Sequence, residues 1–371
     1  MKHFNIHDLL HITVSSQLSN TLQSDLDFQI GAFRSKHDVI NGGLRINLMP
    51  YDAFHGTATS IDFHGWRVEP AVSILNNEDR FAVERDGNQL TIYTDWQWTQ
   101  LPPLIQALLT CHGWSYLHAS SVADADGNVT IFTGPGGVGK TALVGELVIK
   151  RNYRVLSDDL VLVRGDGDCL AWPRPCILKD YHRDVFPEVF RRRGLEGPTG
   201  YKRWREAIRN VMFHLYVNMP LRGVLKSLMS SLNGRRTAES MLGALRAPEF
   251  LDAVPLNELF EAQAIVKSGK TYRVVFLERW SGSGFTQASM PPSIAAQRAW
   301  GILQHEWQSA QPLLNILGAA GLIDIATIHA QSAETLKALF ERCNPIWVRV
   351  PDGTSPTQLA EYFIMQVAGI D

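Results

Sequence analysis

A glycine-rich stretch near the middle of the chain restricts its fold more than any other feature. Residues 134–141 read Gly-Pro-Gly-Gly-Val-Gly-Lys-Thr, which matches the phosphate-binding pattern G-x-x-x-x-G-K-[ST]. Glycines let backbone N–H groups turn inward around phosphate oxygens, and the helix that follows presents its positive N-terminal end to the anion. The pattern therefore requires a strand, a loop and a helix in that order.

The residues on either side of the loop fit this requirement. Residues 129–133 are β-branched or aromatic, as in a buried strand, and residues 142–150 repeat apolar side chains at helical spacing. A turn that binds nothing is the alternative, and these flanks argue against it. We predict a bound nucleoside triphosphate, with the Lys140 ammonium on its β- and γ-phosphates and the Thr141 hydroxyl on Mg²⁺. The predicted nucleotide-binding residues all belong to the loop: Gly134, Gly136, Gly137, Val138, Gly139, Lys140 and Thr141.

The composition of the chain argues against several classes of protein, including nucleic-acid-binding and membrane-spanning proteins. The 371 residues are enough for two domains or for one domain with insertions, and a net charge of −2 gives no pull toward nucleic acid or anionic membranes. The four cysteines show no metal-binding spacing, which is typical of free thiols in a reducing cytoplasm. We find no signal-peptide pattern and no run of 18 apolar residues, so we expect a cytoplasmic chain without a transmembrane span.

The chain divides into three parts by pattern. Residues 1–100 are predicted to be β-rich, with a hairpin at Asp86-Gly87-Asn88 between two apolar runs. Residues 101–371 are predicted to form the domain that contains the loop. Within it, residues 181–250 are locally basic and apolar by turns, which indicates a helical insertion. Either this insertion contacts an acidic partner or an anionic membrane, or its apolar face packs against the rest of the same protein.

The domain around the loop is predicted to contain several further elements. Helices are expected at 104–112, 293–308 and 332–342, with a last helix after residue 353, and strands at 114–122, 153–156, 160–163, 272–277 and 347–350.

Two adjacent carboxylates follow the loop. Asp158 and Asp159 come 18 and 19 residues after Lys140, beyond one predicted helix and one strand. In proteins with a phosphate-binding loop, a carboxylate at this strand end holds Mg²⁺ or acts as a base. With two carboxylates, one can hold the metal while the other accepts a proton. A solvated turn is the alternative. His118, in the strand before the loop strand, either packs in the core or orients a carboxylate.

With these pieces placed, the chain resembles the catalytic domain of HPr kinase/phosphorylase and its wider relatives. The resemblance covers residues 110–180 and 250–371. Its segments keep their order along the chain: the His-Ala segment at 117–122, the phosphate loop at 134–141, the Asp-Asp turn at 156–161, the strand pair at 254–260 and 272–280 ending in Leu-Glu-Arg-Trp, and the Pro-Asp-Gly turn at 350–353 with 359–360.

This resemblance implies an α/β (α+β) P-loop fold shared with ATP-dependent phosphoenolpyruvate carboxykinase, with a mixed and curved sheet around the loop. It implies ATP and Mg²⁺ as ligands and phosphoryl transfer to a hydroxyl. By the same resemblance Asp158 is the general base oriented by His118, Lys140 holds phosphates, and Asp159 and Thr141 lie nearer the metal.

The sequence also departs from the family pattern. The segment Glu-Ile-Arg-Gly-Leu-Gly, expected just before Val254, is absent, and Glu249 is the nearest acidic candidate for its metal-ligating glutamate. The closing Arg-Asn is replaced by Thr354-Ser355. These departures argue against HPr as the acceptor and against the reverse phosphorolysis. Relatives that resemble this layout more closely phosphorylate free serine or serine in a ribosomally made peptide.

The sequence therefore predicts a cytoplasmic ATP- and Mg²⁺-dependent kinase that transfers the γ-phosphoryl group to a hydroxyl, foremost of serine. The acceptor is a peptide, a protein or a small metabolite, and no nucleic-acid partner is expected. The alternatives are a non-catalytic nucleotide-binding sensor and a simple ATPase. The resemblance leaves a homo-oligomer open, because members of the family commonly assemble.

Overall fold

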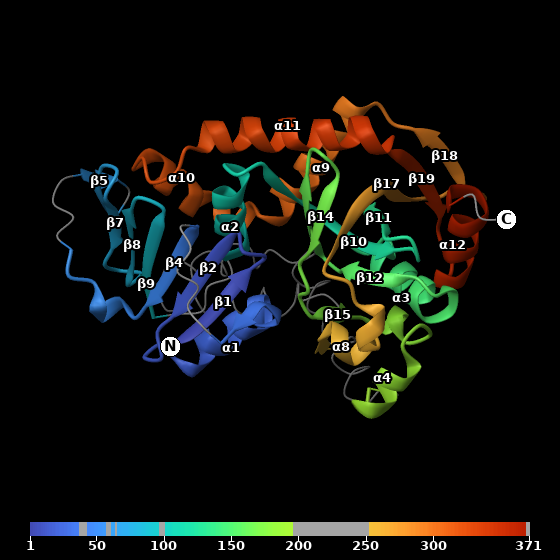
Figure 1. The fold of residues 1–371 in the computed structure, drawn as a ribbon, viewed down its shortest axis with the longest axis horizontal. Coiled ribbons are helices and arrows are strands. Elements are labelled where there is room, and N and C mark those ends of the chain that lie inside the picture. Colours follow the sequence, from blue (N-terminus) through green and yellow to red (C-terminus); the bar gives the residue numbers. More distant parts are fainter. Residues whose placement is uncertain (37–42, 57–60, 64, 96–100, 196–251, 369–371) are drawn as a thin grey trace, which may run out of the picture. The chain divides into compact units, whose positions relative to one another are not determined.

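A computed structural model describes residues 1–36, 43–56, 61–63, 65–95, 101–195 and 252–368. The chain divides into two compact units, one of residues 1–176 with 255–371 and the other of residues 177–254. Most of the predicted insertion and its Glu249 lie outside the described residues. The mixed α/β class expected from the sequence is confirmed, because the described residues form sheets and several helices (Figure 1).

The first sheet of the larger unit is built from the first 94 residues, drawn in blue to teal in Figure 1. Its strand order is β3-β1-β2-β4-β9-β8-β7-β6-β5. The strands are β1 (Lys2–Ile6), β2 (Leu10–Val14), β3 (Arg34–Ser35), β4 (Leu44–Met49), β5 (Ile61–Phe63), β6 (Trp66–Glu69), β7 (Ser73–Asn76), β8 (Phe81–Asp86) and β9 (Gln89–Thr94). Helix α1 (Asn20–Ile30) connects β2 to the residues before β3.

The alternating sequence of β4 explains its place in this sheet. Leu44, Ile46 and Leu48 are buried, while the residues between them are half-buried on the opposite face. Strand β4 pairs in parallel with β2 on one side and β9 on the other. The predicted hairpin is confirmed: β8 and β9 pair antiparallel around Gly87, whose φ of 56° suits the tight turn.

The second sheet of the larger unit contains the phosphate loop. Its order is β11-β10-β13-β14-β17-β19-β18, and β12 pairs with β10. The strands are β10 (Trp114–Ala123), β11 (Asn128–Thr133), β12 (Arg154–Ser157), β13 (Leu160–Arg164), β14 (Asp168–Ala171), β17 (Ser268–Trp280), β18 (Thr286–Ser289) and β19 (Ile346–Pro351).

Strand β17 makes this sheet mixed and curved. It pairs in parallel with β11 and with β19, and antiparallel with β14. Because β14 connects through β13 and β10 back to β11, these pairings run in a closed circuit. A sheet whose strands return to their starting point must curl.

Helices cover the second sheet. α3 (Lys140–Arg151) packs on β10 and β12, and α12 (Pro356–Tyr362) packs on α3. α9 (Pro292–Glu306) and α11 (Ile325–Cys343) pack on each other and on β10 (Figure 1). The remaining helices of this unit are α2 (Leu101–Thr110), α8 (Leu256–Leu259) and α10 (Gln311–Ala319).

The predicted strands and helices of this region are found, with shifted ends. The expected helix at 332–342 is the second half of α11, which begins at Ile325 behind the N-cap of Asp324. Helix α10 has no counterpart among the predicted elements. Between residues 176 and 254, the described residues form a pairing of β15 (Cys176–Leu178) with β16 (Asp252–Val254), and the short helix α4 (Pro187–Arg192).

Candidate functional site

The glycine loop follows the end of β11, beside the parallel strand β17. Strand β11 ends at Thr133, which pairs with Phe276 of β17, and α3 begins at Lys140. Gly134 adopts a φ of 151°, and a Cβ there would collide with the Leu277 carbonyl oxygen. A glycine is therefore required at the first loop position, because the backbone of β17 lies against it.

Lys140 is buried inside the loop, with 8% of its surface exposed. Its Nζ donates to the carbonyl oxygens of Gly134 at 2.7 Å and Pro135 at 3.1 Å. The same ammonium lies 3.4 Å from Nε2 of His118. A buried ammonium needs such oxygen partners, and these contacts hold the cation at the centre of the loop.

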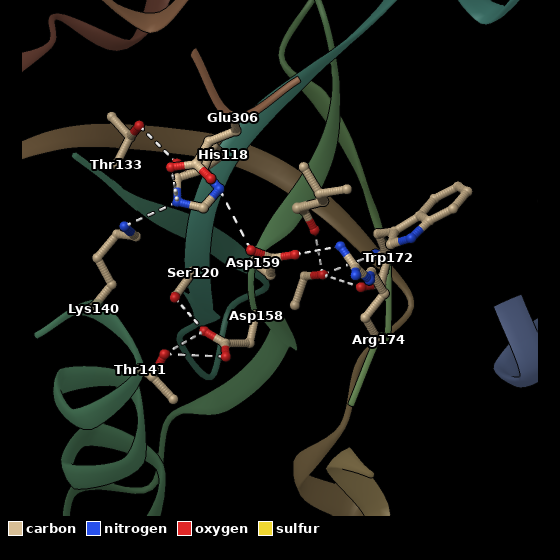
Figure 2. A network of polar contacts seen from close by, with 12 residues as sticks. His118, Ser120, Thr133, Lys140, Thr141, Asp158, Asp159, Trp172, Arg174 and Glu306 are labelled. Atoms are coloured by element: carbon tan, nitrogen blue, oxygen red, sulfur yellow. Dashed lines mark hydrogen bonds and ion pairs between the residues drawn. The ribbon is translucent and has the colours of Figure 1, made fainter. Parts of the chain in front are cut away.

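Asp158 faces the start of α3. The Thr141 hydroxyl lies 3.0 and 3.1 Å from its two carboxylate oxygens, and the Ser120 hydroxyl donates to Oδ1 (Figure 2). The Asp158 residue is 5% exposed. Two hydroxyl groups therefore stabilise this buried carboxylate in place of water.

Asp159 points to the other side of the turn. Its Oδ1 lies 3.4 Å from Nδ1 of His118, and its Oδ2 accepts from Arg174 at 2.5 Å (Figure 2). The Asp159 side chain is 37% exposed. A positive φ of 76° at Asp159 turns its side chain away from that of Asp158. The two neighbouring carboxylates thus have separate surroundings.

His118 lies between Lys140 and Asp159. Burial, followed by the positive charge of Lys140, lowers the pKa of this histidine, while Asp159, Glu306 and Asp158 oppose the shift. These surroundings therefore favour the neutral imidazole. Because an ammonium can only donate, Nε2 is assigned as the acceptor toward Lys140. The proton of the neutral ring is then on Nδ1, the nitrogen that lies 3.4 Å from Asp159 Oδ1.

These contacts reverse the pairing that the resemblance implied. His118 contacts Asp159 rather than Asp158, and Thr141 contacts Asp158 rather than Asp159. The physical reason is the turn itself, since adjacent residues around a positive φ send their side chains in different directions. The structure brings the predicted residues Lys140, Thr141, His118, Asp158 and Asp159 into one polar network (Figure 2).

Three further residues belong to the same network. Ser120 is two positions after His118 on β10, so strand alternation places both on one face and could have indicated it. Arg174 contacts Asp159, and Glu306 at the end of α9 lies 3.9 Å from His118 Nε2. Neither carries a local sequence signal, because only the fold brings them near.

The oxygen atoms at the start of α3 are of the kind that Mg²⁺ prefers. Among the described residues, no group of three or more His, Cys, Asp or Glu could hold a metal by itself. Mg²⁺ is usually bound by one or two protein oxygens together with phosphates and water. The Thr141 hydroxyl and the Asp158 carboxylate fit that requirement.

A separate groove of about 1280 Å³ lies elsewhere in the larger unit. It is lined by parts of β17 and β18 and by the end of α11, and none of the network's residues lines it. The described helices include none that is long and apolar enough to cross a membrane.

No protein-family model matches the chain, and a search of curated proteins finds no significant relative.

Proposed function

We propose that this protein is an ATP- and Mg²⁺-dependent kinase that transfers the γ-phosphoryl group to a hydroxyl of a peptide, a protein or a small metabolite. The observation that carries the proposal is the division of the Asp158-Asp159 pair. One carboxylate is buried and contacts the loop threonine, and the other contacts His118 and Arg174 and is partly exposed. A simple phosphate-binding loop needs only the first of them.

On the loop side, the backbone of residues 134–139 and the Lys140 ammonium would hold the phosphates of ATP. Thr141 and Asp158 would hold Mg²⁺, which supplies charge stabilisation at the phosphates when bound. Asp158 suits this role better than that of a base, because it is buried and already accepts from two hydroxyl groups.

On the other side, Asp159 would accept the proton of the acceptor hydroxyl. The acceptor oxygen forms a bond to the γ-phosphorus, the bond from that phosphorus to the β–γ bridging oxygen breaks, and ADP leaves with that oxygen. The proton passes to the Asp159 carboxylate. His118 would orient this carboxylate through Nδ1–H, and Arg174 would fix its second oxygen.

The proposal includes the fold and the location inferred from the sequence. A glycine loop between β11 and α3, in a mixed sheet closed by β17, supports an HPr-kinase-like P-loop fold. Free thiols at Cys111, Cys169, Cys176 and Cys343 support a reducing compartment such as the cytoplasm.

The first experiment incubates the purified chain with Mg²⁺ and ATP, alone and with free serine, free threonine or a library of serine-containing peptides. Mass spectrometry then searches for a gain of one phosphate, and ADP is measured in parallel. We expect phosphate on one acceptor class. ADP release without a phosphorylated acceptor would instead indicate an ATPase, and nucleotide binding without turnover would indicate a sensor.

The role of Asp159 is tested with Asp159→Asn. Loss of a general base typically costs about 10²- to 10⁴-fold in rate, so we expect a loss of that order with ATP affinity retained. Asp166→Asn, an exposed carboxylate in the turn between β13 and β14, is the matched control. Full transfer activity in Asp159→Asn would refute the base assignment.

A further inference from the structure

Arg279 lies at the same edge of the second sheet as the phosphate loop. It is the second-last residue of β17, which runs parallel to β11, so the carboxyl ends of both strands meet at this edge. Thr133, the last residue before the loop, pairs with Phe276, and Arg279 is three residues further along β17. The strand thus carries this guanidinium past the point where the loop begins.

Two carbonyl oxygens hold one side of the Arg279 side chain. Nη1 donates to the Pro351 oxygen at 2.9 Å and to the Thr354 oxygen at 3.5 Å. Pro351 is the last residue of β19, and Thr354 lies in the turn between β19 and α12. The guanidinium is planar, so fixing Nη1 also fixes the direction of Nη2.

The other side of the guanidinium faces the loop. A Cβ placed on Gly139 would lie only 3.4 Å from Nη2 of Arg279. Gly139 directly precedes Lys140 and is the N-cap of α3. Nη2 is therefore next to the position where the loop backbone turns into the helix.

Among the described residues, no carboxylate forms an ion pair with Arg279, and the neighbouring Glu278 is paired with Arg298 at 2.8 Å. The Asp158 carboxylate contacts Thr141 at the start of α3 instead. Lys140 and the positive N-terminal end of α3 lie on the same side. Like charges gathered at a half-buried edge repel each other, and a bound polyanion would relieve that repulsion.

We propose that Arg279 donates from Nη2 to a phosphate oxygen of the bound nucleotide and so reads the length of the phosphate chain. This inference rests on the proposed function, since it needs a nucleotide in the loop. The turn at Pro351–Thr354 positions the guanidinium for that contact. The chemical class recognised is a polyphosphate, and the base and ribose contribute nothing to the effect of Arg279.

The test compares Arg279→Gln with wild type by calorimetric titration of ATP, ADP, AMP and inorganic tripolyphosphate. A charge-assisted hydrogen bond corresponds to roughly tenfold to a hundredfold in affinity, so we expect Arg279→Gln to weaken ATP and tripolyphosphate by about that factor. AMP should be weakened least. Arg279→Lys keeps the charge but not the two-sided geometry, so its ATP affinity should lie between those of wild type and Arg279→Gln.

Arg273→Gln is the matched control, because Arg273 is on the same strand and stacks on Tyr272, away from the loop. Its nucleotide affinity should equal that of wild type, and the unfolding temperature of each variant reports its folding. Equal weakening of AMP and ATP, or no weakening in a folded Arg279→Gln, overturns the inference while wild-type ATP binding still supports the proposed function. If wild type binds none of these probes, both proposals fail.

Discussion

The two sheets of the larger unit differ in what they bury. Strand β4 at the middle of the first sheet buries Leu44, Ile46 and Leu48, and the ion pairs of Arg80 with Asp52 and Asp95 lie at its surface. Among the described residues, the buried Asp, Glu, Lys and Arg side chains are all in α3 or in the turn after β12 of the second sheet: Lys140, Glu146 and Asp158.

This difference distinguishes residues that stabilise the fold from residues that are suited to a chemical role. Burying a charge is unfavourable unless it is paired or hydrogen-bonded, whereas burying an aliphatic side chain is favourable without partners. Both sheets bury an apolar core that stabilises the fold, and the second sheet also keeps charges that a stable fold alone would not need. Removing a buried charge near the second sheet should lower ligand affinity and leave stability unchanged or higher. Removing a buried aliphatic side chain from the first sheet should lower stability and leave affinity unchanged.

The largest effect is expected at Lys140. Lys140→Met keeps the aliphatic volume and removes the ammonium, so ATP affinity should fall by at least about a hundredfold. The free energy of unfolding should stay the same or rise, because a buried charge is gone. Titration calorimetry and urea unfolding measure the two quantities, with the exposed Lys337→Met as control. Lower stability with normal affinity would contradict the comparison.

The opposite signature is expected at Ile46. This side chain is completely buried in β4, and Ile46→Ala should lower the free energy of unfolding by roughly 2–5 kcal/mol through lost burial and a cavity. ATP affinity of the folded variant should not change. Asn47→Ala, one residue along and on the other face of the strand, should cost less. A large loss of affinity in folded Ile46→Ala would show that the two sheets are not independent.

The buried His182 of the smaller unit tests by pH whether burying a charge lowers stability. Burial, followed by the charge of Lys179, lowers the pKa of His182 to about 4, and its Nδ1 accepts from the Lys179 backbone. As pH falls below 6.5, the unfolded chain takes up this proton before the folded chain does.

Stability should therefore drop between pH 6.5 and 4, by up to about 3 kcal/mol from this group. His182→Asn keeps an acceptor for the backbone and does not titrate, so its urea unfolding curve, followed by circular dichroism, should depend less on pH. An identical pH dependence in both proteins would contradict the shift assigned to His182.

The smallest effect is expected at the surface of the first sheet. Arg80→Gln removes ion pairs to Asp52 and Asp95, and its side chain is 47% exposed. Exposed pairs contribute little, so the free energy of unfolding should change only slightly, and by less still at high salt. Thermal unfolding at two salt concentrations measures this. A larger loss would mean that surface charge also supports the first sheet.

Local patterns were sufficient to predict the loop and its flanking elements. The β-branched run at 129–133, the glycines and the helical spacing at 142–150 each act within a few residues, and β11 and α3 follow them. Helix α10 was missed because its nine residues are too few for a clear period. The compact units divide after residues 176 and 254, where chain contacts are few, and the boundary expected near residue 100 stays a prediction.

The sequence was sufficient to single out several residues of the candidate site, but not to predict which side chains contact one another. Asp158 and Asp159 could be singled out by their distance from Lys140, yet the side that each carboxylate faces depends on the φ of Asp159, which no pattern encodes. Arg174 and Arg279 come to the site through pairing of β13, β14 and β17 in the curved sheet. Contacts between distant segments need the fold.

The contacts of Lys140 bear on the speed with which the proposed nucleotide would bind. Lys140 is only 8% exposed, and the Gly134 and Pro135 oxygens already accept from its ammonium. An incoming phosphate would replace these oxygen partners and would find little water to remove from so buried a cation. Most of the cost of dehydrating the ammonium would then fall on folding rather than on the encounter with the ligand.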